Sequence, residues 1–185
     1  MIWPPRLQPT TFVNIGGIQI SRTPKKLPAD IQAFLETPDA STHGVILFTL
    51  GFIFDPKAVS DSDVQTIFDA FAQLPQKVVM KFNPLPSEST LVVPKNVLVK
   101  SFLPQQDILA HKNVVLFITH CGMHGVMESI YHGVPMLGIP IFMDQGDVLQ
   151  RIIEKGIGIG IDKRASSEEI VTGVKTVIED GRRAI

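Results

Sequence analysis

The chain has 185 residues, enough for one domain with a substantial hydrophobic core. Its 17 Lys and Arg residues nearly balance 18 Asp and Glu residues, so it lacks the positive excess that attracts nucleic acid or an acidic membrane surface. The single cysteine excludes an internal disulfide, no apolar run approaches the roughly 20 residues that span a bilayer, and residues 1–12 lack the pattern of a signal peptide. A hydrophobic content of 44% fits either a parallel sheet buried on both faces or a surface made for a partner domain.

Residues 1–44 are rich in proline and show little hydrophobic periodicity. Because proline disfavours regular structure, we expect extended chain here, with one short helix near Pro28–Glu36. The pattern changes from residue 45 onward, where apolar runs alternate with amphipathic segments. We therefore predict a leading segment over 1–44 and a domain over 45–185.

Three strands and two helices are predicted in the first part of that domain. The continuous apolar run Val45–Gly51 is typical of a strand buried on both faces. Residues 60–75 carry apolar side chains at helical spacing behind a Ser and Asp start, and Pro75 ends the predicted helix. Further strands are predicted over 77–82 and 96–102, and a short helix over 104–111.

The alternation continues to the end of the chain. Gly133 is placed to cap the end of a helix, and Ser166 and Glu169 have the spacing of a capping box. Strands that alternate with helices of this length predict an α/β fold, a Rossmann-like parallel sheet with helices on both faces. The predicted strands are 113–120, 134–140 and 157–163, and the predicted helices are 122–133, 144–156 and 166–180.

Small and polar residues gather after the predicted strands, where a core needs none. In such sheets the carboxyl ends of strands and the N-termini of helices share one edge, which binds ligands. The turn Gly122–Gly125 offers free backbone N–H groups and a positive helix end to an anion, and His120 can donate a hydrogen bond to it. A helix cap or a tight turn would explain the same glycines.

Acidic and amide side chains flank this predicted anion site. Glu128 lies one helical turn beyond His124 on the same side, and its carboxylate suits sugar hydroxyls because it only accepts hydrogen bonds. Asp144 and Gln145 follow the next strand and repeat that chemistry. An anion site with hydroxyl-binding groups on either side describes a nucleotide-sugar. Of the remaining candidates, His111 and His132 are both interpreted as solvated or helix-end residues, and Cys121 as a packing residue.

The ordered motifs FLPQQDILAH and FITHCGMHGVMESIYHGVPMLGIPIFMDQ resemble the donor-binding signature of the UDP-glycosyltransferases. The resemblance is to the animal branch that includes glucuronosyltransferases and insect glucosyltransferases. It extends from IGG at 15–17 through HGVILFTLG at 43–51 to VIED at 177–180. It implies the C-terminal half of a two-domain GT-B enzyme, the half that binds the UDP-sugar, with no cofactor and no metal.

The resemblance also implies a role for individual residues. Phe102 would stack on uracil, Gln105 would contact the ribose region and Glu128 would bind ribose hydroxyls. His120 and the turn Gly122–Gly125 would meet the diphosphate. Thr49 and Gly51 match a small phosphate-side loop, and Asp144 and Gln145 would hold sugar hydroxyls. With Leu103 beside Phe102, the whole predicted donor site is Thr49, Gly51, Phe102, Leu103, Gln105, His120, Gly122, His124, Gly125, Glu128, Asp144 and Gln145.

Three positions depart from the family pattern. The family commonly has Trp where Phe102 stands, and base stacking contributes about 1–3 kcal/mol. A small hydroxyl residue is usual at Phe52, so a phosphate-side hydrogen bond of about 1.5–3 kcal/mol is lost. His124 replaces Asn and would add charge when protonated, which a phosphate favours and the positive helix end opposes. If the phosphate dominates, UDP affinity should rise as pH falls from about 8 to 6; a His124 that points to solvent would have no such effect.

The resemblance places the catalytic base, a His paired with an Asp, in an N-terminal domain that also binds the acceptor. That domain and a C-terminal membrane anchor are expected to be absent from this chain. We therefore predict that the chain binds the donor without catalysing transfer. The parent would transfer a hexosyl or glucuronosyl group from UDP to a small lipophilic acceptor in the endoplasmic reticulum membrane, with this domain in the lumen.

Other functions stay open at this point. A degenerate nucleotide-sugar-binding module could pair with an active glycosyltransferase, and an epimerase could use the same GT-B half. The expected partners are a UDP-sugar and the N-terminal domain, with no nucleic acid or membrane contact by this chain and with homo-oligomerisation open. No Lys or Arg that would pair with the carboxylate of glucuronate is evident, so UDP-glucose and UDP-glucuronate are not distinguished.

Overall fold

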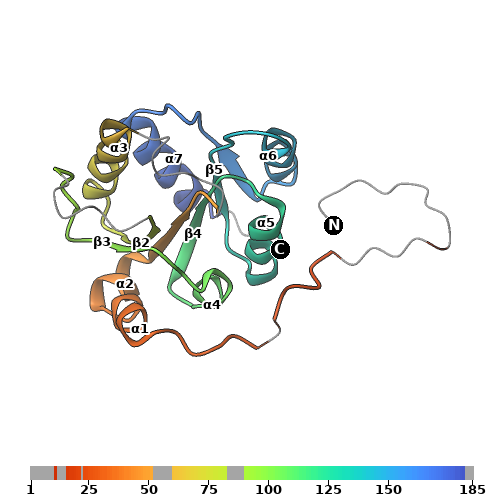
Figure 1. The fold of residues 1–185 in the computed structure, drawn as a ribbon, viewed down its shortest axis with the longest axis horizontal. Helices are drawn as coiled ribbons and strands as arrows, with labels where there is room; N and C mark the ends of the chain where they lie inside the picture. Colours follow the sequence, from red (N-terminus) through yellow and green to blue (C-terminus); the bar gives the residue numbers. More distant parts are fainter. Residues whose placement is uncertain (1–10, 12–15, 22, 52–59, 83–89, 182–185) are drawn as a thin grey trace.

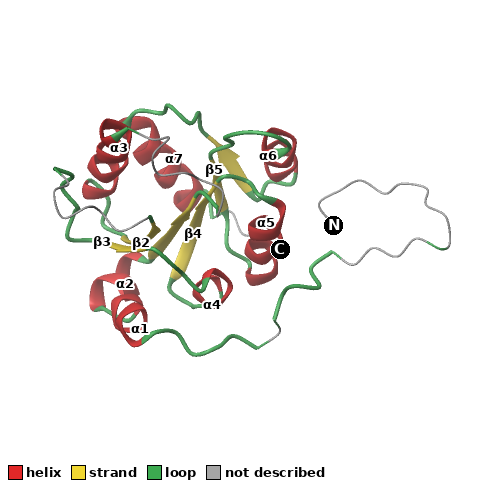
Figure 2. Cartoon of the chain, in the orientation of Figure 1, coloured by secondary structure: helices red, strands yellow, loops and turns green. Residues whose placement is uncertain are grey.

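The computed structural model describes residues 11, 16–21, 23–51, 60–82 and 90–181. Within these residues, parallel strands form one sheet in the order β3-β2-β1-β4-β5-β6 (Figures 1 and 2). The order reverses between β1 and β4, as in a Rossmann fold. The predicted fold class is confirmed. The strands are β1 (Val45–Thr49), β2 (Lys77–Lys81), β3 (Val97–Lys100), β4 (Val114–Thr119), β5 (Met136–Gly138) and β6 (Gly158–Gly160).

Helices cover both faces of the sheet. In β1, Val45 and Leu47 pack into one hydrophobic cluster and Ile46 and Phe48 into another. Side chains alternate across a strand, so this division explains why a strand buried on both faces reads as a continuous apolar run. The first cluster contains residues of α1 (Ala29–Leu35), α2 (Pro38–His43), α4 (Gln105–Leu109), α5 (Met123–His132) and α6 (Gln145–Glu154), and the second contains residues of α3 (Asp61–Ala72) and α7 (Ser167–Glu179).

Local signals set the helix ends. Ser166 and Glu169 form the predicted capping box, in which the Ser166 N–H donates to Glu169 Oε2 at 2.8 Å and the Glu169 N–H to Ser166 Oγ at 3.3 Å. Gly133 ends α5 in the left-handed conformation with φ 70°, as predicted. The helix that begins after Ser60 ends at Ala72, shortly before the proline expected to stop it.

The leading segment contains one helix more than predicted. Helix α1 lies within the expected range, but α2 was missed because Ala40 is its one buried residue and its six residues show no periodicity. Its ends are marked instead by Thr37, whose hydroxyl accepts from the Ala40 N–H, and by Gly44 at φ 85°. No helix in the described part of the chain is long and apolar enough to cross a membrane.

Candidate functional site

A cavity of ≈ 630 Å³ opens at the carboxyl edge of the sheet. It lies over the switch point between β1 and β4, and its walls come from the ends of β1, β2 and β4 and from α4 and α5. The predicted site residues were selected from segments far apart in sequence, yet all of them except Asp144 line this cavity. Position 52, one of the three departures from the family pattern, lies outside the described residues.

One side of the cavity is held by a chain of side-chain hydrogen bonds. Thr49 Oγ1 at the end of β1 donates to Gln105 Oε1 at 2.8 Å, and Gln105 Nε2 donates to Glu128 Oε2 at 2.7 Å. Gly125 makes room for this bridge, because a Cβ there would lie 3.2 Å from Gln105 Nε2 and 3.3 Å from the Phe117 ring. The bridge orients Glu128 toward the cavity and leaves its carboxylate further acceptor capacity.

The other side is built around the His120 imidazole, which is confined between two glycines. A Cβ on Gly51 would lie 2.7 Å from His120 Cε1, and a Cβ on Gly122 would lie 2.8 Å from the same atom. Gly51 also has a φ of 88°, which side chains rarely adopt. The lack of a side chain at both positions therefore has a packing reason, in addition to the predicted approach of a phosphate.

The environment of His120 favours its neutral form. Burial lowers the pKa of the ring, the positive charge of Lys81 acts in the same direction, and the Thr49 carbonyl and the Asp144 carboxylate oppose them. Nδ1 is buried and forms no hydrogen bond within the described part of the chain, although the Thr49 carbonyl lies near enough to favour protonation. A neutral ring can still donate one hydrogen bond to a ligand.

Lys81 is a cavity residue that sequence reasoning missed. It is the last residue of β2, it lines the cavity, and its Nζ donates to the Gly51 carbonyl oxygen at 3.5 Å. The segment was interpreted only as a strand, because no motif surrounds the lysine. The available signal was the one that selected His120, namely a polar residue at the carboxyl end of a buried strand.

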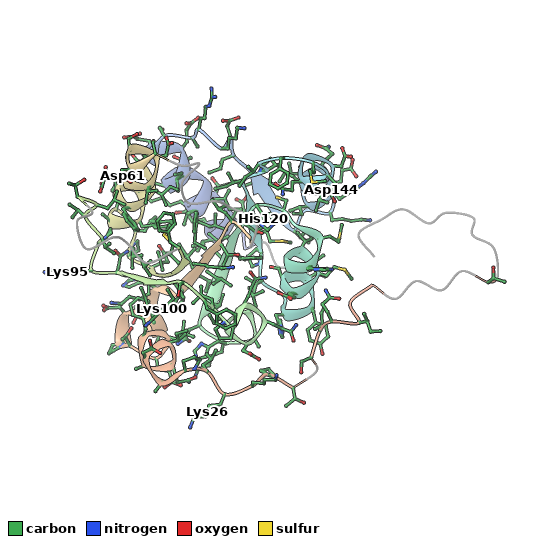
Figure 3. All side chains as sticks on the ribbon, viewed as in Figure 1. Lys26, Asp61, Lys95, Lys100, His120 and Asp144 are labelled. Atoms are coloured by element: carbon green, nitrogen blue, oxygen red, sulfur yellow. The ribbon has the colours of Figure 1, made fainter. Side chains whose placement is uncertain are left out.

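The residues predicted to hold sugar hydroxyls are placed differently from each other. Asp144 is exposed at the N-cap of α6 and does not line the cavity, although its charge reaches His120 (Figure 3). Gln145 lines the cavity but is 5% exposed, and its Oε1 accepts from the N–H groups of Ile141 and Phe142 at 2.8 and 3.1 Å. Its side-chain oxygen therefore fixes the loop between β5 and α6.

The two remaining departures, Phe102 and His124, both line the cavity and are exposed, with 76% of Phe102 accessible. A large accessible ring is what stacking on a base requires.

The side chains interpreted as structural lie outside the cavity lining. His132 is the last residue of α5, in line with the helix-end interpretation, whereas His111 is partly buried and not solvated. Partial burial lowers the pKa of both rings. Cys121 is buried, and burial raises the pKa of its thiol to about 12, so it is a packing residue and not a nucleophile. A group of three or more His, Cys, Asp or Glu side chains that could hold a metal does not occur within the described residues.

Comparison with known proteins shows the family. The family model described as "UDP-glucoronosyl and UDP-glucosyl transferase" matches residues 2–183. UDP-glucosyltransferase 2 of Dactylopius coccus is 37% identical over 91% of this chain, and human UDP-glucuronosyltransferase 2A3 is 35% identical over 96% of it. The matches cover 31% and 32% of those proteins, so the chain spans about a third of the length of these relatives.

Solved structures show the same fold. Os79 from O. sativa in complex with UDP superposes with a TM-score of 0.72 at 20% identity, over 85% of this chain and 38% of Os79. The glycotransferase of kitacinnamycin superposes with a TM-score of 0.66 at 26% identity, over 76% of this chain and 36% of its own. The fold and the edge cavity define a Rossmann-like half of a GT-B glycosyltransferase. The chain belongs to the UDP-glucuronosyl and UDP-glucosyl transferase family.

Proposed function

We propose that this chain is the donor-binding half of a UDP-dependent glycosyltransferase. The parent protein would transfer a hexosyl or glucuronosyl group from UDP to a small lipophilic acceptor. The observation that carries the proposal is the Thr49–Gln105–Glu128 bridge, which presents a carboxylate to a cavity at the N-terminus of α5. The names of the relatives, which include glucosyl- and glucuronosyltransferases, and the UDP in the Os79 complex support it.

Each part of a UDP-sugar has a chemically suited wall in this cavity. Glu128 would accept hydrogen bonds from the ribose hydroxyls, and the exposed ring of Phe102 would stack on uracil. The diphosphate would meet the free N–H groups of the first turn of α5 and one N–H of neutral His120. Asp144, exposed beside this edge, would bind sugar hydroxyls.

Donor binding without turnover is the second part of the proposal. An inverting transfer needs a base that removes the proton of the acceptor hydroxyl as it attacks the anomeric carbon. We assign no such base to this chain, because His120 is confined between Gly51 and Gly122, where we place the diphosphate. A second domain would supply the base and the acceptor site.

Calorimetric titration with UDP, UDP-glucose, UDP-glucuronate and ADP tests the proposal. We expect micromolar to low-millimolar binding of the three uridine ligands, ADP at least about tenfold weaker, and no sugar transfer to a phenol. Glu128→Gln should weaken UDP binding, while Glu179→Gln, an exposed change at the end of α7, should not.

Two results would contradict this function. Equal affinity for ADP and UDP would contradict the proposal that the cavity recognises uridine. Lack of binding by a folded chain that still associates with a full-length family enzyme would favour a degenerate, non-catalytic module instead.

A further inference from the structure

Lys81 gives the cavity a positive charge that no sequence motif predicted. No other Lys or Arg among the described residues lines the cavity. Two acidic residues, Asp107 and Glu128, lie in the same lining, both contributed by the α4 and α5 side. The cation therefore comes from the end of a strand, and these two carboxylates come from helices.

The sheet register places Lys81 beside the other phosphate-side residues. Met80 pairs with Phe48 of β1, and Thr49 pairs with Thr119 of β4. Lys81 follows Met80 and His120 follows Thr119, so both lie just past the last residues paired with β1, at the same edge of the sheet. Gly51 contacts both of them. The 3.5 Å hydrogen bond from Lys81 Nζ to the Gly51 carbonyl, and the closeness of Gly51 to the His120 ring, fix this grouping.

His120 supplies a hydrogen bond to this group but little charge. Burial and the nearby Lys81 lower the pKa of its ring, so the imidazole is neutral near neutral pH. A diphosphate carries several negative charges, and a lysine ammonium is a common point-charge partner for it.

We propose that Lys81 binds the phosphate oxygens of the donor and supplies the positive charge of the diphosphate subsite. This inference rests on the proposed function. It assigns the ammonium to the diphosphate because Lys81 lies beside Gly51 and acts on the His120 ring. The residues predicted to hold the sugar, Asp144 and Gln145, follow β5, which lies on the opposite side of β4 from β1 and β2. Recognition of a glucuronate carboxylate by Lys81 is the rival outcome.

Matched substitutions at two strand ends test the inference. Lys81→Met removes the charge and keeps an apolar stem, and Lys100→Met makes the same change at the last residue of β3, outside the cavity lining. Affinities for uridine, UDP, UDP-glucose and UDP-glucuronate would be measured for both variants and the unsubstituted chain. Thermal unfolding checks that each variant folds, and Lys81→Gln replaces Lys81→Met if the latter does not.

We expect Lys81→Met to weaken UDP and both UDP-sugars by a common factor of about ten or more, and to leave uridine unchanged. Lys81→Arg should retain most of the affinity, and Lys100→Met all of it. Unchanged UDP binding, or an equal loss of uridine, would overturn the inference. A loss confined to UDP-glucuronate would also overturn it, in favour of carboxylate recognition. Absence of UDP binding by the unsubstituted chain would instead refute the proposed function itself, and the inference with it.

Discussion

The two sides of the cavity hold their polar groups in different ways. On the α4 and α5 side, Thr49, Gln105 and Glu128 satisfy one another through hydrogen bonds of 2.8 and 2.7 Å. On the strand side, the His120 ring is held by its fit between two glycines, and its buried Nδ1 has no partner within the described residues. Side-chain hydrogen bonds therefore hold the first side in place, and close packing of the His120 ring holds the second.

This difference separates stability from binding. A buried polar group without a partner costs about 1–3 kcal/mol, so breaking the bonded side should destabilise the fold as well as the site. The strand side has fewer side-chain hydrogen bonds to lose. Changes of hydrogen bonding there should affect ligand binding more than folding, whereas changes of shape should affect both.

The largest expected effect comes from Gly51→Ala, which breaks the fit on the strand side. The new Cβ would lie 2.7 Å from His120 Cε1, in a ring that also packs closely against Gly122. We expect UDP affinity to fall by at least about tenfold. The free energy of unfolding should fall by more than about 1–2 kcal/mol, the cost of placing an alanine in the left-handed conformation without any clash. UDP titration and chemical denaturation measure both.

Gly156→Ala is the matched control for that change. Gly156 has a φ of 66°, and nothing lies within 4 Å of its added Cβ. It therefore carries the backbone cost without the clash. Equal losses of stability and equal UDP affinity in the two variants would show that the confinement of His120 has no consequence.

Gln105→Leu, a change on the hydrogen-bonded side of the cavity, should have a smaller effect. It leaves the hydroxyl of Thr49, a residue that is 1% exposed, and the Glu128 carboxylate without their partner. We expect a loss of about 1–3 kcal/mol of unfolding free energy, with weaker UDP binding. Denaturation and titration test this against Gln150→Leu, an exposed change on α6. Weaker binding at unchanged stability would contradict the stabilising role of the bridge.

The smallest expected effect is the pH dependence caused by His120. Burial lowers the pKa of its ring below the ordinary 6.5, so the unfolded chain binds this proton more readily than the folded one. The contribution to stability is complete above pH 6.5 and is lost as pH falls toward the folded pKa. Denaturation of the unsubstituted chain and of His120→Gln should therefore differ in slope between about pH 7.5 and pH 5.

His111 and His132 also have lowered pKa values and remain in both proteins, so their contribution cancels in that comparison. Parallel pH profiles would show that the His120 ring is not desolvated in solution.

Much of the fold follows from local patterns. Strand β1 reads as an apolar run because both of its faces are buried, and α7 begins where Ser166 and Glu169 form a capping box. Helix α2 could not be predicted this way, since Ala40 is its one buried residue. Local propensity is informative when a segment has a face to bury, and α2 has almost none.

The residues that form the site were easier to predict from the sequence than the hydrogen bonds between them. The resemblance and the rule that ligands bind at strand ends selected residues that do line one cavity. The hydrogen bonds of Gln105 join residues 56 and 23 positions apart, and no sequence spacing reports such contacts. The position of Lys81 at the end of a buried strand was readable from the sequence, but its contact with Gly51 depends on strand pairing and was not.

Cys121 gives the chain a built-in reporter of opening. It is the single cysteine, it directly follows His120, and its thiol is buried with a pKa of about 12. A thiol reagent can modify it only after the core packing around Cys121, next to the cavity residue His120, opens locally, so the labelling rate measures that opening equilibrium. Any ligand that binds the closed cavity should slow labelling in proportion to its occupancy, without mutation or attached probe.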